Sequence, residues 1–546
     1  MTEAADSPFV FRLAAIGIAA LFFVAIAPTL RWQEFTSGSE NLVVTTAMEM
    51  HRGGPKLVPN LQGEKRIAKP PLPAWVTYLS ISPATMRGVG SPDPTVRAIG
   101  FSTLGWQARL PALLAAALLL IATYELGRAV RSPRVGLLAT CVAASTLMLL
   151  RFGRASTTDI HLALWVSVAN ACIAHGLCRG KIKVPWIGGG IALGLAMMCK
   201  GPVCLVQTLL PAFVFMLIRR TPRKPFHPIP VIIGTLLFVA VGLSWYVYVF
   251  ATTPGVMGRW FSEVSRLDAR DSSEASSLFY SYFSFIPFLF PWIVFFIVGV
   301  IITVMKSKRQ SINDLLPLLM TFVPIVVMTF FKDRQERYLL PLIAPAAVVA
   351  AIGLREHLKS WAAWSSIDTV VTAIHWVLLA IPALIAAVFL GDKMLFIAAG
   401  IVALSVIVGA IAHRVRQVAL PAFTLAILLG LQAVAVRWYS QSEQGSSELR
   451  PLADTIATQY PTADVFAIRP DRKRPPPDLA VYLNRIVRSV PTADTIEASN
   501  GPAIALMIQR RGELSPLAPP GFRYLDKALR DKKDFWWAFV RDTPTN

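Results

Sequence analysis

Long apolar runs separated by short polar stretches recur through most of this sequence. Each run has about 20 residues, enough for a helix to cross a hydrocarbon core of about 30 Å. Because the membrane core offers no water to the backbone, an open chain satisfies its peptide groups there only as a helix. The pattern therefore predicts an α-helical polytopic membrane protein with about thirteen transmembrane helices. The runs begin near Leu13, Leu110, Val135, Ile160, Trp186, Val203, Pro230, Phe283, Leu315, Tyr338, Val370, Leu395 and Val418.

The composition supports this pattern. Of 546 residues, 54% are hydrophobic and 16% are charged, whereas an ordinary soluble domain has about 25% charged residues. A soluble globular protein, a disordered chain and a disulfide-rich secreted module are therefore excluded. The five cysteines lie in or beside apolar runs without the paired spacing of a zinc or disulfide framework. We expect no cysteine chemistry.

The charge distribution predicts an orientation. Lys and Arg number 53 against 32 Asp and Glu, a net charge of +21, but the cations lie mainly in short connections between apolar runs, so we expect no nucleic-acid partner. The even-numbered connections carry Arg128/Arg131/Arg134, Arg179/Lys181/Lys183, Arg219/Arg220/Arg223/Lys224, Lys306/Lys308/Arg309, Arg355/Lys359 and Arg414/Arg416. The positive-inside rule places these connections in the cytoplasm. The first run is then an uncleaved span with its N-terminus inside, and the long first loop and the tail face outward.

The tail differs in composition from the rest of the chain. Strands are predicted over Asp464–Ile468, Ile504–Ile508 and Phe535–Val540, with a helix over Leu479–Val487 between them. No nucleotide-binding glycine loop, Walker sequence or histidine cluster is present in this part of the sequence. We expect a transmembrane domain over residues 1–439, which includes the outer loop 29–109, and a small α/β domain over residues 440–546.

Charged residues on the predicted outer side do not follow the topology rule. They lie in Arg151–Asp159, at Lys200, in Arg259–Glu274 and in Lys332–Arg337. Each of them taken alone can be explained without a functional site, as a side chain at the membrane interface that reaches water. As a set that faces the same side as the first loop, they favour the lining of a polar cavity.

The first loop contains two further candidates. Ser37 and Glu40 have the spacing of a capping box, so Glu40 is either a helix cap or a carboxylate placed to deprotonate an incoming hydroxyl or amine. The two roles are compatible. Lys69 is followed by two prolines, which stiffen the segment. A rigidly held cation at a membrane surface suits a lipid phosphate, although attraction to anionic headgroups alone would also explain it.

A set of short motifs follows in order between about residue 10 and residue 350. They are Ala47–Met50, Val58–Gly63, Lys69–Leu72, Ala108–Pro111, Arg154 to Asp159, Lys200–Pro202, Phe290–Trp292 and Arg337–Pro341. In order and spacing this set resembles the GT-C glycosyltransferases that use polyprenyl-phosphate sugars, in particular the lipid A aminoarabinose transferases and the protein O-mannosyltransferase-like bacterial enzymes. The resemblance implies a GT-C-like fold in the bacterial inner membrane, with a periplasmic first loop and tail.

The reaction that the resemblance implies is an inverting transfer. A sugar would move from an undecaprenyl or other polyprenyl monophosphate to a lipid, glycolipid or protein acceptor on the periplasmic side, such as lipid A or another cell-envelope glycolipid. The partners are this lipid-linked donor, the acceptor and membrane lipids. No nucleotide and no certain cofactor is implied; a divalent metal stays open.

The resemblance also suggests roles for individual residues. The family's catalytic aspartate aligns with Ser39, which cannot act as a base without an activating partner, so we assign the base to the adjacent Glu40. A family glutamate aligns with Ala68, which weakens the inference of a metal there. Asp159 is the expected second carboxylate. The expected ligands of the donor phosphate are Lys69, Arg266 and Tyr338, with Lys200, Arg334 and Arg337 as neighbours, because cations stabilise the charge that develops on a leaving phosphate.

Two other functions stay open at this stage. In a lipid or glycolipid transporter, the outer charges would line a translocation path. In a catalytically silent protein that binds polyprenyl phosphate, Ser39 would mark the lost base. The stiff outer loop with its clustered cations favours the enzyme.

Overall fold

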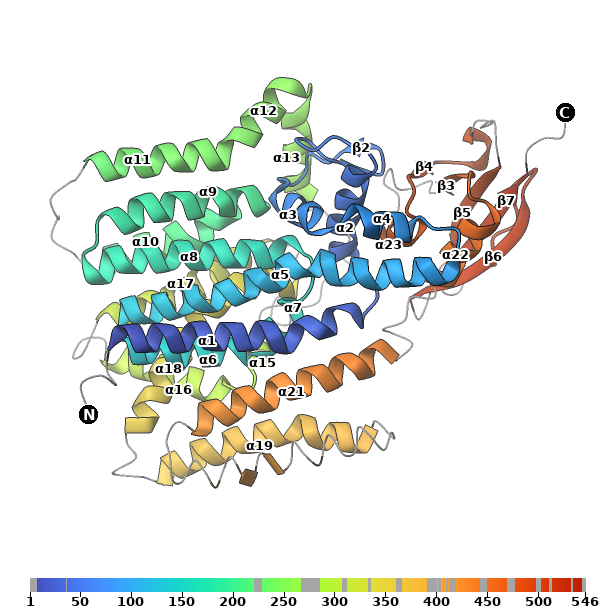
Figure 1. Ribbon diagram of the computed structural model, residues 1–546. Coiled ribbons are helices and arrows are strands. Elements are labelled where there is room, and N and C mark those ends of the chain that lie inside the picture. Colours follow the sequence, from blue (N-terminus) through green and yellow to red (C-terminus); the bar gives the residue numbers. More distant parts are fainter. Residues whose placement is uncertain are drawn as a thin grey trace. The chain divides into compact units, whose positions relative to one another are not determined.

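The computed structural model describes residues 7–35, 37–219, 228–266, 285–306, 312–331, 335–359, 366–389, 400, 404–405, 407–408, 411, 419–441, 449–468, 477–496, 502–509, 513–531 and 534–542. The chain divides into two compact units (Figure 1). Unit 1 comprises residues 1–28, 68–72 and 112–435, and unit 2 comprises residues 29–67, 73–111 and 436–546. Most of the first loop, which composition assigns to the transmembrane domain, thus clusters with the tail.

Unit 1 is built of helices, many of which run side by side with roughly aligned axes (Figure 1). They are α1 (Pro8–Ile26), α5 (Pro94–Val130, divided between the units at Pro111), α6 (Pro133–Ala144), α7 (Leu147–Phe152), α8 (Thr158–Arg179), η3 (Val184–Gly188), α9 (Gly189–Lys200), α10 (Val203–Arg219), α11 (Pro228–Phe238), η4 (Val239–Leu243), α12 (Ser244–Thr252), α13 (Val256–Arg266), α15 (Phe285–Phe288), α16 (Ile293–Lys306), η6 (Ile312–Asp314), α17 (Leu315–Met328), η7 (Glu336–Leu342), α18 (Ile343–Lys359), α19 (Ser366–Phe389) and α21 (Ala419–Gln441, divided between the units after Ala435).

Several of these helices have the length and composition to cross a membrane. Among the described residues, they are Pro8–Arg31, Pro94–Val130, Thr158–Arg179, Pro228–Thr252, Glu336–Lys359 and Ala419–Ser440. Shorter apolar helices cover Pro133–Ala144, Val184–Lys200, Val203–Arg219, Ile293–Met305, Ile312–Met328 and Asp368–Ala380. These helices match the predicted spans except the one near Leu395, which falls largely outside the described residues. A membrane protein of many helices is thus supported, and the number thirteen stays a prediction.

Two helices begin at other residues than the predicted apolar runs, although the part of the first that belongs to unit 1 begins at Ala112, close to the predicted Leu110. The helix expected from Leu110 begins at Pro94, where the Asp93 carboxylate accepts a hydrogen bond from the Thr95 amide at 2.7 Å. Its first turns carry polar residues, so a search for apolar runs misses them. The helix expected from Phe283 also differs, because the continuous apolar helix α16 begins only at Ile293.

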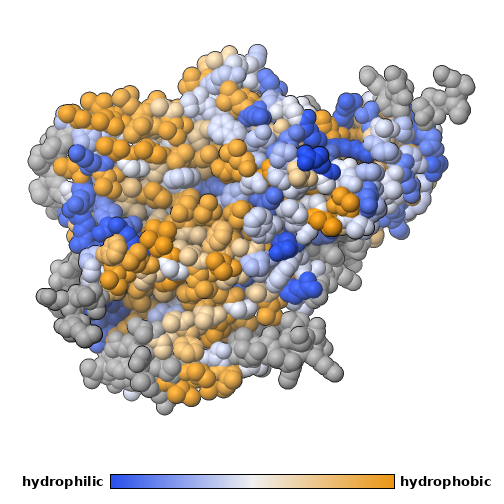
Figure 2. Space-filling view, viewed as in Figure 1, coloured by the Kyte–Doolittle hydropathy of each residue, from blue (hydrophilic) through white to orange (hydrophobic). Residues whose placement is uncertain are grey.

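Close helix packing in unit 1 depends on glycine. A Cβ atom at Gly299 of α16 would lie 2.0 Å from the carbonyl oxygen of Val349, and one at Gly353 of α18 would lie 2.2 Å from that of Phe295. Neither position can accept a side chain, so α16 and α18 approach backbone to backbone. On the outside, large apolar side chains such as Phe9 and Val24 are exposed, and Figure 2 shows a broad hydrophobic surface over these helices, as a lipid-facing surface requires.

Unit 2 combines the first loop with a five-stranded sheet. From the first loop come α2 (Gly38–His51), the hairpin of β1 (Asn60–Leu61) and β2 (Glu64–Lys65), α3 (Leu72–Ser80) and α4 (Pro83–Val89). From the tail come α22 (Leu449–Gln459), β3 (Asp464–Ile468), α23 (Pro477–Leu483), β4 (Val487–Val490), η9 (Ala493–Thr495), β5 (Ala503–Gln509), β6 (Arg523–Asp531) and β7 (Asp534–Arg541). The strand order is β4-β3-β5-β7-β6.

The sheet is mixed, with β3 parallel to β4 and β5, and β7 antiparallel to β5 and β6. The three predicted strands of the tail are present as β3, β5 and β7. The helix predicted over Leu479–Val487 is too long: α23 ends at Leu483, because Asn484 adopts a left-handed conformation with φ of 51°, and Val487 opens β4. One face of the sheet packs against α22, α23 and α2, and this layer forms the core of unit 2.

Candidate functional site

Asp159 lies in the first turn of α8, in unit 1. The helix begins after Thr157 and ends where Gly180 adopts a left-handed conformation with φ of 70°, so the sequence determines both ends. A carboxylate in the first turn is favoured by the helix dipole. The side chain is only 3% exposed, and a carboxylate at this depth requires cationic or hydrogen-bonding partners.

Two cations supply those partners. The Lys200 ammonium donates to Oδ1 of Asp159, and Nε of Arg337 lies 3.2 Å from Oδ2. Lys200 is the last residue of α9 and is followed by Gly201, whose φ of +83° only glycine adopts readily. Arg337 belongs to η7, which packs against α8. The sharp turn after α9 and the η7 segment thus bring both cations to one carboxylate.

Tyr338 completes this group. The Lys200 ammonium nitrogen lies 3.6 Å from the centroid of the Tyr338 ring, and the guanidinium carbon of Arg337 lies 5.5 Å from it. We refer to Asp159, Lys200, Arg337 and Tyr338 as the Asp159 cluster. With two cations and one carboxylate, its formal charge is +1. Arg337 and Lys200 remain 25% and 14% exposed, so the cluster can offer hydrogen-bond donors to an anionic group such as a phosphate.

The remaining predicted phosphate ligands are placed only in part. Lys69 belongs to unit 1 and is half-buried. Arg266 is the last residue of α13, but its side chain lies outside the described residues, as does all of Arg334. Beside the cluster, Arg151 pairs with Glu336 at 3.2 Å. Acidic and basic residues of the segments 151–159 and 335–337 therefore contact each other. Such contact is expected if both segments face the same side of the membrane, as the sequence predicts.

Glu40, in unit 2, does not make the predicted capping box. Ser37 is the N-cap of α2, but its side chain makes no capping hydrogen bond. The Glu40 carboxylate instead forms a bidentate ion pair with Arg109, at 2.8 Å to Nε and 2.9 Å to Nη2. Both side chains are only 4% exposed. A bidentate guanidinium competes better for a buried carboxylate than a single backbone amide does, which explains the difference from the sequence prediction.

No role for Arg109 is predicted from the sequence. Its guanidinium also donates to the carbonyl oxygens of Leu30, Gln33 and Glu34, at 2.6 to 3.0 Å, and lies 4.7 Å from the ring of Phe35. It therefore fixes the chain that leads into α2. The one signal in the sequence was its position in the Ala108–Pro111 motif.

Glu49 is a second residue without a predicted role. Its buried carboxylate accepts hydrogen bonds from the amides of Gln62 at 2.8 Å and Gly63 at 3.1 Å, at the tip of the β1–β2 hairpin. Gln62 and Gly63 both have positive φ, 58° and 80°, as a tight hairpin turn requires. The Gln62 side chain accepts a further bond from the Val487 amide. Glu49 thus anchors the part of the first loop that carries the Val58–Gly63 motif.

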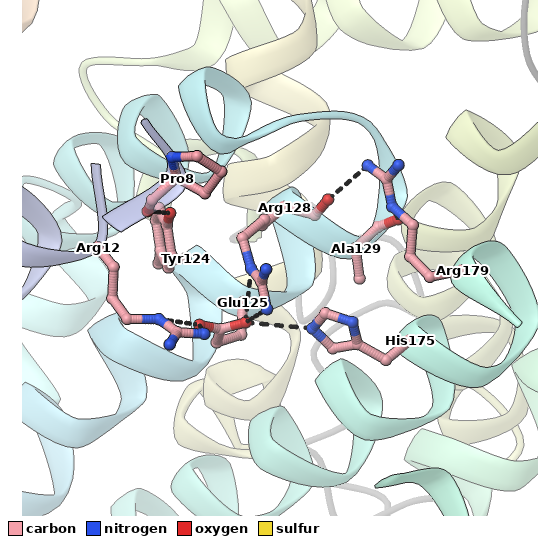
Figure 3. Close-up of polar contacts among 8 residues, drawn as sticks. All are labelled: Pro8, Arg12, Tyr124, Glu125, Arg128, Ala129, His175 and Arg179. Carbon is pink, nitrogen blue, oxygen red and sulfur yellow. Dashed lines mark hydrogen bonds and ion pairs between the residues drawn. The ribbon is translucent and has the colours of Figure 1, made fainter. Parts of the chain in front are cut away.

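A second polar cluster of unit 1 is centred on Glu125 (Figure 3). The carboxylate binds Arg12 and Arg128 at 2.6 Å and the His175 ring at 3.1 Å. Nearby, Arg179 donates to backbone carbonyls at the end of α5, while Arg131 pairs with Asp314 and Glu356. These residues lie in or next to several of the connections that are predicted to be cytoplasmic. In the structure, these connections contact one another.

No group of histidine, cysteine or acidic residues that could hold a metal occurs among the described residues. Ala68, where the family pattern has a glutamate, contributes no ligand atom from its side chain.

The chain is similar to several known proteins. The family model described as dolichyl-phosphate-mannose-protein mannosyltransferase matches residues 97–245. An undecaprenyl phosphate-α-4-amino-4-deoxy-L-arabinose arabinosyl transferase of Proteus mirabilis is 23% identical over 350 residues, 61% of this chain and 58% of the relative. The corresponding transferase 1 of Sodalis glossinidius is 25% identical over 355 residues, 62% of this chain and 59% of the relative. Each match thus spans less than two thirds of the relative.

Solved structures extend the similarity to nearly the whole chain. The structure of ArnT from Cupriavidus metallidurans bound to undecaprenyl phosphate superimposes with a TM-score of 0.70 at 18% identity, and covers 95% of this chain and 97% of that one. Its apo form gives a TM-score of 0.69 at 17% identity, with the same coverage. The chain therefore has the fold of ArnT, the GT-C-like fold that its motifs imply.

Proposed function

We propose that this protein is an inverting glycosyltransferase of the bacterial inner membrane that uses an undecaprenyl (polyprenyl) monophosphate-linked sugar as donor. The carrier phosphate is the leaving group. The acceptor lies on the periplasmic side and is lipid A or another cell-envelope glycolipid. The observation that carries this proposal is the Asp159 cluster, which lies in a fold shared with a protein whose structure contains undecaprenyl phosphate.

The cluster fits the donor phosphate by charge. Charge builds on the departing phosphate oxygens as the sugar–oxygen bond breaks, and preorganised cations stabilise that charge. Lys200 and Arg337 would bind the oxygens, with Lys69, Arg266 and Arg334 as further ligands. Asp159 holds both cations in fixed positions, so they need little reorganisation when the phosphate arrives. Tyr338 supports Lys200 through its ring.

Glu40 is the proposed base that takes the proton of the acceptor. Arg109 binds both of its carboxylate oxygens, and because each carboxylate oxygen has two lone pairs, this binding does not by itself prevent a hydrogen bond from an acceptor hydroxyl or amine. Ser39 lies in the first turn of α2, and its hydroxyl is 3.0 Å from that of Ser37. No carboxylate side chain is present at that position.

The proposed orientation places the Glu125 cluster at the cytoplasmic surface and the Asp159 cluster on the periplasmic side. The contact among cation-rich connections around Arg128, Arg131 and Arg179 supports it, since the positive-inside rule assigns such connections to the cytoplasm. The sheet of unit 2 would then belong to a periplasmic α/β domain.

The experiment is transfer by the purified protein in lipid vesicles. A panel of undecaprenyl-phosphate sugars is offered together with membrane extract, and released undecaprenyl phosphate is measured by mass spectrometry. Release that depends on the extract and is lost in Lys200→Met, while the exposed-site control Arg523→Ala retains it, supports the transferase. If no sugar of the panel is released, the proposed reaction is wrong for those donors.

A catalytically silent carrier-binding protein is the second candidate. The observation in its favour is the engagement of both Glu40 oxygens by Arg109, together with serine at position 39. The wild-type rate separates the two, because a silent protein releases no undecaprenyl phosphate. In an active protein, Glu40→Gln tests the base: a transferase with Glu40 as base loses at least about 100-fold in rate. Activity that survives this substitution removes Glu40 as the base.

A further inference from the structure

The sheet of unit 2 has two different faces. On one face, Trp536, Ala538 and Val540 of β7 are buried against the layer formed by α22, α23 and α2. The alternate residues of β7 point to the other face, and there the register pairs Phe539 with Tyr524 and Trp537 with Lys527 of β6. We call Tyr524, Lys527, Phe535, Trp537, Phe539 and Arg541 the aromatic face.

The rings of this face form a continuous group. The Tyr524 ring lies 5.5 Å from that of Trp537 and 6.3 Å from that of Phe539, and the Trp537 and Phe539 rings are stacked at an angle of 14°. Phe539 is buried, whereas Tyr524 is 48% exposed and Trp537 is half-buried. Ring surface is therefore available at the β6 edge of the sheet.

Polar contacts hold the rings in place. The Trp537 indole N–H donates to Oε1 of Gln509 at 2.8 Å, and the amide of Gln509 donates to the Glu513 carbonyl oxygen at 2.8 Å. Because both ends of the Gln509 side chain are engaged, the indole has a fixed orientation. A fixed ring can bind a partner without the entropy cost of ordering it first.

The charges of this face are predominantly positive. Lys527 lies 5.1 Å from the Trp537 ring, and Arg541 lies 5.1 Å from the ring of Phe522. Arg488, opposite Phe466 in the register, is exposed on the same face. Asp464, opposite Ala503, is an acidic residue on this face, and the charge of Asp526 in β6 also acts on Tyr524. The face therefore favours an anionic partner.

We propose that the aromatic face binds an anionic saccharide, the phosphorylated headgroup of the glycolipid acceptor. The apolar C–H face of a sugar ring matches the negative face of an aromatic ring, and Lys527 and Arg541 would bind its phosphates. Ile468, Val490 and Met507 pack partly buried on this face, whereas the exposed side chains that β6 places on it are Tyr524 and Lys527, which favours a sugar at that edge. This proposal rests on the proposed function, because it identifies the saccharide as part of the acceptor.

The test is direct binding by the full-length protein in detergent, without donor. A water-soluble phosphorylated hexosamine disaccharide is titrated, and its affinity is compared with that of the unphosphorylated disaccharide and of inorganic phosphate. We expect the phosphorylated disaccharide to bind best, and Tyr524→Ala and Lys527→Ala each to weaken it by about three- to tenfold. The matched control is Arg523→Ala, which removes a cation from the other face of β6, where Arg523 pairs with Asp542. This change should alter the affinity by less than about twofold.

Equal effects of Lys527→Ala and Arg523→Ala on the affinity for the disaccharide would overturn the proposal, as would binding of inorganic phosphate as strong as that of the disaccharide. A third contrary result is that Tyr524→Ala weakens self-association or binding to anionic vesicles but leaves the affinity for the saccharide unchanged. The last would identify a second copy or a membrane as the occupant. The binding test contains no donor and is therefore independent of the transfer experiment. Saccharide binding together with a failed transfer experiment would contradict the transferase alone, and transfer without saccharide binding would contradict the aromatic face alone.

Discussion

The ammonium nitrogen of Lys200 lies 3.6 Å from the centroid of the Tyr338 ring. A cation at this distance from a ring face is stabilised by about 1 to 2 kcal/mol when partly desolvated. Tyr338 therefore acts on Lys200 through its ring, whereas the family resemblance suggests that it contacts the carrier phosphate. The cation–π contact with Lys200 needs only the ring of Tyr338, whereas a hydrogen bond to the carrier phosphate needs its hydroxyl.

Substitution of Tyr338 distinguishes these roles. Tyr338→Phe keeps the ring, so we expect kcat/KM for the lipid-linked donor to stay within about twofold of wild type. Tyr338→Leu removes the ring and should lower kcat/KM by about tenfold, as the cation–π energy predicts. A loss in Tyr338→Phe as large as that in Tyr338→Leu would show that the hydroxyl is the functional group.

Arg109 is expected to stabilise unit 2. Arg109→Lys keeps the charge but loses the bidentate contact with Glu40 and the fork that binds three carbonyl oxygens. Replacement of a buried, fully engaged guanidinium should lower the free energy of unfolding by about 3 kcal/mol. Thermal unfolding in detergent measures this, with Arg87→Lys at an exposed position of α4 as control. Equal melting temperatures of the two variants would contradict the structural role.

Glu49 is expected to hold the β1–β2 hairpin closed. Glu49→Gln replaces one accepting oxygen with a donor that faces the amides of Gln62 and Gly63, which should cost about 2 kcal/mol. Amide hydrogen exchange should then become faster in residues 55–66. The matched variant is Glu64→Gln, which changes an exposed side chain of the same hairpin and should leave the exchange rates unchanged. Unchanged exchange in Glu49→Gln would remove the anchor.

Tyr482 should make stability depend on pH in the alkaline range. Burial, and secondarily the charge of Glu34, raises the pKa of its hydroxyl well above the usual value, and this oxygen accepts a hydrogen bond from the Phe35 amide at 2.6 Å. Below pH about 10 both the folded and the unfolded tyrosine keep the proton. Above it only the unfolded one loses the proton, so the free energy of unfolding should fall by up to about 1.4 kcal/mol per pH unit.

Melting temperatures of wild type and Tyr482→Phe between pH 8 and pH 11 test this dependence. The variant should be less stable at pH 8, because the Phe35 amide loses its acceptor, but it should lose less stability as the pH rises. Parallel curves for the two proteins would show that Tyr482 is not the titrating group.

Much of the membrane part could be predicted from the sequence, because apolar runs and basic connections are local signals. The end of α8 at Gly180 and the turn after Lys200 are also local, because both depend on a glycine with positive φ. The partners of Asp159 could not be found in this way, since Arg337 reaches it from a distant segment. Motif order suggested a common site for these residues, but only the packing of η7 and α9 on α8 shows their contact.

The first loop shows why a local pattern can mislead. The spacing of Ser37 and Glu40 is that of a capping box, yet the carboxylate binds Arg109, 69 residues away. A charge pair in a buried setting is stronger than a single capping bond, and no local pattern reveals it. The same holds for Glu49, whose partners are backbone amides of a turn that becomes visible only in the fold.

The central claim is that the cations of the Asp159 cluster bind the carrier phosphate. Its most direct test is the affinity of the reconstituted protein for labelled undecaprenyl phosphate, compared among wild type, Lys200→Met, Arg337→Met and the control Lys183→Met, which changes an exposed lysine of unit 1. We predict a loss of at least about tenfold in each of the first two variants, since each removes a charge-assisted contact, and wild-type affinity in the control. Wild-type affinity in Lys200→Met and Arg337→Met would contradict the account.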